Sequence, residues 1–324
     1  MQNSKKYFLL SVFFFFLIKL CCSLEIKVAV LKFGSVNWEL DVIFHHKLDE
    51  KYDIKINKLV MTNKDAATIA FLSKAVDVFV TDWIWVSKQR AKKNLFTFIP
   101  YSTAAGGLLV PSYSSVQSIS DLEGKSVGIA GGSLDKSWLF FRAYCIKKFN
   151  KDPIKYFKAS FAAPPLINGL ILNGELKGAI NYWNYAARLE AKGFKKIINI
   201  KEILPTLGIE GDLPLIGYVF AENFHNTNPK IINNFIKASL EARKILDESD
   251  SEWIRIKKLT GANDDKMLAV VRDSFRKGIP NENLNAMKNS IERAYSVLAE
   301  IGGKKLVGSN TKLTKGTLWE KSYK

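Results

Sequence analysis

The turn Gly131-Gly132-Ser133 is the segment of this sequence best suited to holding a ligand. Glycines let the backbone approach a bound group closely, and free N–H groups at a helix start attract anions. Ser133 and Ser137 add hydroxyl donors. Because two glycines match neither a dinucleotide fingerprint nor a P-loop, a simple strand-to-helix turn is the alternative. The chemistry predicted here is recognition of an anionic group.

Aromatic side chains gather at the other predicted loop ends. Five of the seven tryptophans and two tyrosines lie there: Trp38, Trp83, Trp85, Trp138, Tyr182, Trp183 and Tyr185. A flat aromatic wall suits a planar or partly apolar ligand, because stacking adds to burial. Trp85 and Trp138 lie inside predicted helices, where a core position is the simpler interpretation. Trp38 and Trp183 lie nearest to the turns, and we expect them to sandwich a planar group.

Two charged residues stand near the same turns. Asp82 follows a short apolar segment and precedes a predicted helix. Its carboxylate suits a ligand N–H or a cation, and it equally suits a helix N-cap. Arg188 lies on the helix after Trp183 and is within reach of a ligand carboxylate, although a salt bridge is the simpler interpretation.

The sequence has no pattern typical of catalysis or metal binding. No nucleophile-base pair or paired carboxylates are evident, and Asp135 and Lys136 lack a partner at readable spacing. His45, His46 and His225 have no cysteine or carboxylate at metal-ligand spacing. We therefore predict no enzyme, no cofactor and no metal site.

These residues depend on alternating strands and helices for their positions. Strands are predicted at 25–33, 53–60, 76–81 and 96–100, and helices at 38–48, 63–75 and 82–92. This order predicts a parallel sheet covered by helices. A second set has strands at 106–111, 125–130, 178–182 and 196–200, and helices at 135–149, 164–175 and 184–191. The apolar segment 213–220 should return the chain to the first unit, and helices follow it.

In such sheets ligands bind at the carboxyl ends of strands, where loops turn into helices. The predicted ligand-binding residues are those loop positions: Gly34, Ser35, Trp38, Asp82, Trp83, Ser102, Thr103, Gly132, Ser133, Pro165, Asn181, Trp183 and Tyr185.

The composition is basic, with a formal net charge of +17. Such a balance suits a nucleic-acid or anionic surface. The lysines are scattered and mostly near acidic residues, and no nucleic-acid-binding motif is present. The charge therefore indicates a solvated, lysine-rich surface, and no nucleic-acid partner is predicted.

The first 23 residues have the pattern of an export signal. Two early lysines precede an apolar run with four consecutive phenylalanines, and Cys21, Cys22 and Ser23 supply small residues for cleavage. The run is shorter than the roughly 20 residues of a membrane-spanning helix. Cleavage after Ser23 is expected, with lipidation at Cys21 or Cys22 as the alternative. Only Cys145 would then remain, so no internal disulfide is possible.

Five segments of the chain resemble the solute-binding proteins of ABC transporters of the nitrate, sulfonate and taurine class, and the binders of thiamine-pyrimidine precursors are similar. They are TDWIWVSKQRA, FIPYSTAAGGLLVP, DLEGKSVGIAGGSLDKSWLFFRAY, AAPPLINGLILNGELKGAINYWNYAARLEAKGF and LPLIGYVF. The run of a strand, DLEGKSVGI, a glycine turn and a helix is the most specific feature. The resemblance covers nearly all of the chain after the expected signal.

The resemblance implies an α/β fold of the type II periplasmic binding class, with parallel-rich sheets, helices on both faces and a two-strand hinge. We expect a signal at 1–23, domain 1 at 24–109 and 218–324, and domain 2 at 110–217. Closure around one small molecule, planar or anionic, would use hinges near 108–111 and 215–218.

The resemblance also implies delivery to an ABC transporter permease in the inner membrane, a periplasmic location and a monomer. Two alternatives remain. One is an enzyme acting on a pyrimidine or vitamin precursor, although the cysteine-rich motif of a related eukaryotic enzyme is missing. The other is a ligand-binding sensor that feeds no transporter.

Overall fold

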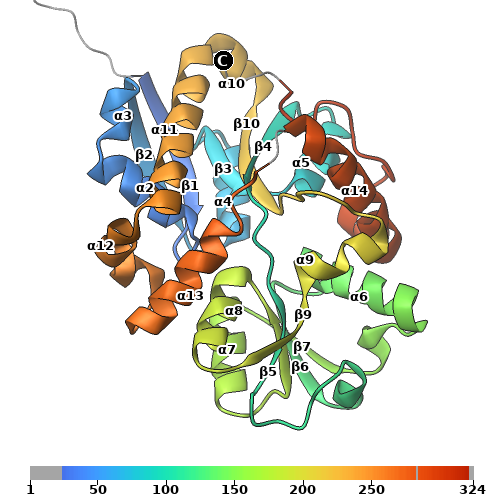
Figure 1. The fold of residues 1–324 in the computed structure, drawn as a ribbon. Coiled ribbons are helices and arrows are strands. Elements are labelled where there is room, and N and C mark those ends of the chain that lie inside the picture. The colour runs from blue at the N-terminus through green and yellow to red at the C-terminus, as the bar shows by residue number, and fades with distance from the viewer. Residues whose placement is uncertain (1–23, 282–283, 321–324) are drawn as a thin grey trace, which may run out of the picture.

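The computed structural model describes residues 24–281 and 284–320, which form two five-stranded sheets with helices packed on their faces (Figure 1). The first sheet has the order β2-β1-β3-β10-β4 and the second the order β7-β6-β8-β5-β9. The predicted α/β class with helix-covered sheets is confirmed. The signal-peptide prediction and its lipoprotein alternative concern residues outside the described part.

The first sheet is mixed. β1 is parallel to β2 and β3, whereas β10 is antiparallel to β3 and β4. Its strands are β1 (Leu24–Leu31), β2 (Ile54–Met61), β3 (Val78–Thr81), β4 (Phe96–Ser102) and β10 (Ile216–Ala221). The helices between them are α2 (Val36–His45), α3 (Leu48–Lys51), α4 (Lys64–Leu72) and α5 (Trp83–Arg90). The single helix expected at 38–48 is divided, because Lys47 takes a left-handed conformation with φ 52°.

The second sheet repeats this design. β6 is parallel to β7 and β8, and β5 is antiparallel to β8 and β9. Its strands are β5 (Gly107–Val110), β6 (Ser126–Ala130), β7 (Lys158–Ala162), β8 (Gly178–Asn181) and β9 (Lys195–Asn199). The associated helices are η1 (Ser120–Leu122), α6 (Lys136–Phe149), η2 (Pro153–Lys155), α7 (Pro164–Leu172), α8 (Trp183–Ala191), α9 (Ile200–Ile203) and η3 (Pro205–Leu207). β7 is a strand that the sequence analysis missed.

Short polar side chains cap three of the described helices that follow strands, namely α4, α5 and α6. Asn63 accepts the Ala66 N–H at the start of α4, Asp82 accepts the Trp85 N–H at α5, and Asp135 accepts the Ser137 and Trp138 N–H groups at α6. Such caps satisfy donors that have no partner within the helix. Asn63, the first residue of the helix predicted at 63–75, is therefore the N-cap of α4.

The C-terminal helices join the two sheets along their flanks. They are α10 (Glu222–Thr227), α11 (Pro229–Glu248), α12 (Asp250–Thr260), α13 (Asp265–Arg276) and α14 (Leu284–Val307). α13 packs against α8, and α14 packs against both α5 and α6. One continuous apolar core contains Phe79 of the first sheet, Ile129 of the second and Ile291 of α14. Among the described residues, no helix has the length and apolar character to cross a membrane.

The chain passes between the sheets at 103–106 and again at 208–215. β5 pairs with β8 and β9 of the second sheet, which favours placing the first crossing ahead of the expected boundary at 109/110. The division into two domains and the two hinges stay predictions.

Candidate functional site

Asp82 lies at the centre of an ion network between the two sheets. Its Oδ2 accepts from Lys136 Nζ at 2.9 Å and from Lys64 Nζ at 3.1 Å. Lys64 and Asp82 follow strands of the first sheet, whereas Lys136 follows β6 of the second. The Asp82 side chain is 8% exposed and that of Lys136 is 15% exposed, while Lys64 remains half exposed. One carboxylate oxygen therefore ties the two units together.

Both lysines occupy the first residue of a helix, Lys64 in α4 and Lys136 in α6. A helix N-terminus carries partial positive charge, so a cation there is unfavourable unless an anion is present. In this structure Asp82 is that anion. Neither lysine was among the predicted ligand-binding residues. The sequence signal that could have identified both as site residues is a lysine at the first position of a helix that follows a strand.

The charge state of Asp82 follows from its neighbours. Burial by itself would raise the pKa of its carboxyl group, but Lys136, Lys64 and the Trp85 N–H together hold that pKa far below its usual range. Asp82 is thus ionised at any physiological pH. The predicted N-cap role is confirmed, because Oδ1 accepts the Trp85 N–H at 2.9 Å.

The glycine turn faces the same network from the second sheet. Gly131 has φ 81° and Gly132 φ 95°, which are left-handed conformations that favour glycine. A methyl group on Gly131 would collide with the Tyr182 hydroxyl, whereas one on Gly132 would meet open space. The turn is thus open on one side and closed by Tyr182 on the other.

Tyr182 and Asp135 lie next to the glycine turn. Burial, and then the nearby charges of Asp135 and Asp82, raise the pKa of Tyr182, so its hydroxyl stays protonated and available as a donor. Burial also raises the pKa of Asp135 above its ordinary value, despite Lys136 and two backbone N–H groups. Ser133 is exposed at the outer part of the turn.

Asn181 positions Tyr182. Its amide donates to Pro164 O at 2.9 Å and Asn168 Oδ1 at 2.8 Å, and its Oδ1 accepts the Tyr182 N–H at 2.8 Å. Asn181 is 1% exposed, so its polar atoms serve β8 and α7. Pro165, in the first turn of α7, is exposed.

Ser102 and Thr103 use their hydroxyl groups within the protein. Both donate to Gly278 O at 3.3 Å, and Ser102 Oγ also accepts the Ala104 N–H. These contacts fasten the first crossing between the sheets to the end of α13. Gly34 is half-buried and Ser35 is buried at the end of β1.

Trp38 and Trp183 come together, as the sequence predicted, but in direct contact. Their ring centroids are 5.7 Å apart with an interplanar angle of 84°. Trp38 is 2% exposed, and its indole N–H donates to Leu259 O. This edge-to-face contact leaves no slot for a planar group between the rings in this structure, and ligand stacking by the two tryptophans stays a prediction.

Two other predicted aromatics are buried. Trp83 is fully buried, with its N–H donated to Pro214 O at 2.7 Å. Tyr185 is also buried and packs beneath the Arg188 guanidinium, which donates to Thr260 O at 2.7 Å. These contacts favour packing roles, and the ligand role of both aromatics stays a prediction.

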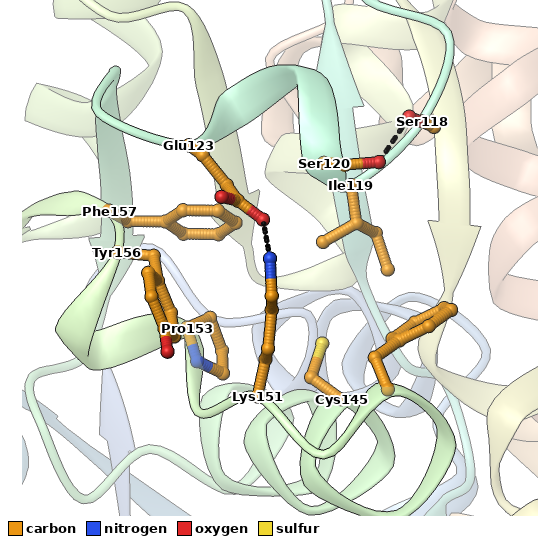
Figure 2. A pocket seen from close by; sticks show the side chains of 10 residues that line it. Ser118, Ile119, Ser120, Glu123, Cys145, Lys151, Pro153, Tyr156 and Phe157 are labelled. Carbon is orange, nitrogen blue, oxygen red and sulfur yellow. Dashed lines mark hydrogen bonds and ion pairs between the residues drawn. The ribbon is translucent and has the colours of Figure 1, made fainter.

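A separate pocket of about 380 Å³ lies in the second unit (Figure 2). It is lined by residues in and next to η1, α6 and η2, including Ile119, Cys145 and Phe157. The Lys151–Glu123 ion pair lies across it. η1 precedes β6 and η2 precedes β7, so the pocket lies at the amino ends of these strands. It is therefore distinct from the edge that carries the glycine turn and Asp82.

Comparison with solved structures shows which fold this is. The aliphatic sulphonate binding protein SsuA of Escherichia coli matches with a TM-score of 0.71 and 13% identity over 92% of each chain. The alkanesulfonate-binding protein SsuA of Xanthomonas axonopodis, solved with MOPS, matches with a TM-score of 0.67 and 15% identity, covering 91% of this chain and 98% of its own. The nitrate-binding protein NrtA of Synechocystis matches with a TM-score of 0.56 and 10% identity over 78% of this chain and 69% of its own.

The chain has the fold of these periplasmic binding proteins, as the sequence resemblance implied. No protein-family model matches it. No curated protein matches it in sequence either.

Proposed function

We propose that this protein is the solute-binding component of an ABC importer and that it captures a small organic anion between its two sheets. The observation that carries the proposal is the meeting of Lys64 and Lys136, from different sheets, on one Asp82 oxygen. The strand ends, the glycine turn and the two lysines converge on this region, which is where α/β sheets bind their ligands.

The charges of the network favour an anion. Two lysines face one ionised carboxylate at Asp82, and the second carboxyl group, Asp135, has a raised pKa that disfavours its charge. The ammonium groups of Lys64 and Lys136 lie at the first turns of α4 and α6, where the helix N-termini add partial positive charge. The protonated Tyr182 hydroxyl and the open Gly132 backbone supply neutral donors at the same place.

The ligand class follows from this chemistry together with the comparisons. Sulfonate, carboxylate and similar oxyanions accept from ammonium, hydroxyl and backbone N–H groups. The structural neighbours are described as binding sulfonates or nitrate, which supports the same class. Because Trp38 and Trp183 contact each other, we propose a ligand recognised mainly through its charged end.

The transport role supplies the partner and the location. We propose a permease in the inner membrane as the partner and a periplasmic, monomeric receptor released after cleavage at Ser23, with domains at 24–109 with 218–324 and at 110–217. An enzyme on this scaffold has no comparable support, since the neighbours are named as binding components.

The test begins with the ligand itself. Protein purified from its native compartment is denatured, and released small molecules are identified by mass spectrometry. The identified anion, and a series of alkanesulfonates, are then titrated calorimetrically into the wild type and into Lys64→Met and Lys136→Met. We expect each variant to lose about tenfold in affinity or more, because a charge-assisted contact contributes about 1.5–3 kcal/mol.

Lys58→Met is the matched control, because Lys58 is an exposed lysine of β2 outside the network. Its affinity should equal that of the wild type. The proposal would be contradicted if the purified protein retained a cationic or neutral ligand. It would also be contradicted if Lys64→Met, Lys136→Met and Lys58→Met all bound the anion with equal affinity.

A further inference from the structure

The end of α2 and the start of α12 bring together three metal-binding side chains. His45 is the last residue of α2, His46 follows it, and Glu252 lies in the first turn of α12. One ligand atom from each residue lies within 4.8 Å of the other two. Both histidines are exposed, while Glu252 is buried. We infer that His45, His46 and Glu252 bind one divalent transition-metal cation of the Zn²⁺ type.

Glu252 is held in place for this role. Its Oε1 accepts from Arg255 Nε at 2.9 Å and from the guanidinium NH2 group at 2.6 Å. Its Oε2 lies 3.3 Å from His46 Nε2. The Ser249 hydroxyl fixes the same turn by accepting the Glu252 N–H at 3.2 Å. A carboxylate with one oxygen occupied and the other turned toward two imidazoles is typical of an oriented metal ligand.

The surrounding charges are compatible with a cation. Arg255 opposes a cation, but it also pairs with Asp41 at 2.5 Å. Asp41 lies one helical turn before His45 on α2. Asp41 and Glu252 therefore outweigh Arg255 by one negative charge. The carboxyl end of α2 carries partial negative charge, which also favours a cation next to the two histidines.

The distances require only small side-chain rotations. Zinc bonds of about 2.0–2.2 Å in a tetrahedral site put neighbouring ligand atoms about 3.3 Å apart. The His46–Glu252 pair is already at that separation. His45 is an exposed helix-terminal side chain, so it can turn toward them. Two imidazoles and a carboxylate leave one position for water and match ligand sets that favour Zn²⁺, Ni²⁺ or Cu²⁺ over Mg²⁺.

The site lies outside the proposed ligand cleft. α2 begins after β1, at the carboxyl end of the sheet, and its ten residues extend about 15 Å before His45. Bound metal would fasten α2 to α12 and stabilise the first unit. The inference therefore stands whether or not the transport proposal does.

A simpler explanation is an ion pair between protonated His46 and Glu252. That pair leaves His45 without a role, and it predicts no metal binding beyond that of scattered surface groups. The two explanations differ in whether His45 contributes to Zn²⁺ affinity, so substitution of His45 distinguishes them.

The test is calorimetric titration of ZnCl₂ into the mature protein, prepared without a histidine tag, at neutral pH with excess Mg²⁺. We expect one saturable site, and a higher melting temperature with Zn²⁺. His45→Asn and His46→Asn should each weaken binding about tenfold or more, since even groups that only orient ligands alter affinity by about 10–100-fold. Glu252→Gln should do the same, and circular dichroism checks its folding.

Glu50→Gln is the control. The Glu50 side chain is 69% exposed and lies on the neighbouring helix α3, and this substitution removes the same charge as Glu252→Gln. It should bind Zn²⁺ like the wild type. Absence of a saturable site, or a His45→Asn affinity equal to that of Glu50→Gln, overturns the inference. If the two histidine variants fold normally, these outcomes are decisive even when Glu252→Gln does not fold.

Discussion

Asp82 has two roles in one side chain. Oδ1 caps α5, and Oδ2 joins Lys64 to Lys136 across the two sheets. The sequence left a cap and a ligand acceptor as alternatives. The cap is present, and the second oxygen is occupied by lysines. A ligand anion would therefore compete with Asp82 for the lysines.

Asp82→Asn tests this competition, because asparagine also caps helices. The two lysines would lose their shared anion, so we expect the free energy of unfolding at neutral pH to fall by about 1–3 kcal/mol. Affinity for an anionic ligand should rise, because the lysines are no longer neutralised. Urea unfolding and calorimetry measure the two effects. A lower anion affinity would mean that Asp82 itself contacts the ligand.

The same variant has a defined pH dependence. The folded-state pKa of Asp82 lies well below the ordinary value of an aspartate carboxyl group. Its stabilisation is therefore complete above that ordinary value and is lost as the pH falls toward the folded-state pKa. The stability difference between wild type and Asp82→Asn should be constant from about pH 5 to 8 and shrink below about pH 4. A difference that persists undiminished at low pH would argue against an ionised Asp82.

At the scale of elements, helix α8 presents Trp183 to the first unit. Trp183 contacts Trp38 edge-to-face and lies 6.1 Å from Phe275 of α13. α8 and α13 pack together along one flank. Trp183 is therefore part of the joint between the units, and its half-buried state reflects that position.

Trp183→Ala should therefore act mainly on stability. We expect the free energy of unfolding to fall by about 2–3 kcal/mol. This is at or below the lower end of the values for truncation of a buried aromatic side chain to alanine, because the Trp183 ring is only partly buried. Ligand affinity should change less than in Lys136→Met. Tyr113→Ala, an aromatic that is 82% exposed, is the control and should leave the melting temperature unchanged. A large affinity loss with normal melting would restore the stacking role.

The edge strand β7 shows where element prediction failed. Its residues Lys158–Ala162 are mostly exposed and, among the described strands, pair with β6 alone. Without a buried face the segment has no apolar alternation, which is the main signal for a strand. Its pairing depends on a neighbour 32 residues earlier in the chain, Ser126 with Lys158.

At the scale of the whole molecule, the contacts between the two units include the Asp82–Lys136 ion pair, the packing of α8 on α13 and the apolar packing of α14 on α5 and α6. Domain motion is the usual expectation unless such an interface is large and apolar. Here the packing of α14 restrains opening on one side, so movement should occur mainly at the side with the ion pair.

Solution scattering tests this arrangement. Without ligand, Asp82→Asn should have a larger radius of gyration than the wild type, because the ion pair that joins the units is missing. Saturating ligand should return it to the wild-type value, since an anion bridging Lys64 and Lys136 replaces Asp82. Identical profiles for both proteins, with and without ligand, would argue against a hinge that this network controls.

The sequence by itself determined the fold class and most elements. Alternating, β-branched residues predicted β1, short apolar segments predicted β3, β6 and β8, and the glycines and aspartates at their ends predicted the turns. These signals are local, because a strand face and a helix cap depend on residues a few positions apart. The glycine turn was recognised for the same reason, and its positive φ angles confirm the need for glycine.

Only the tertiary structure decided which side chains share a site. Lys64 and Lys136 meet on one oxygen although 72 residues separate them, and Glu252 reaches His46 from more than 200 residues away. Trp38 packs against Trp253 of α12 and Phe275 of α13, two residues that lie more than 200 positions later in the chain. Contacts of this kind arise from how helices pack on sheets, and no spacing within the chain encodes them locally.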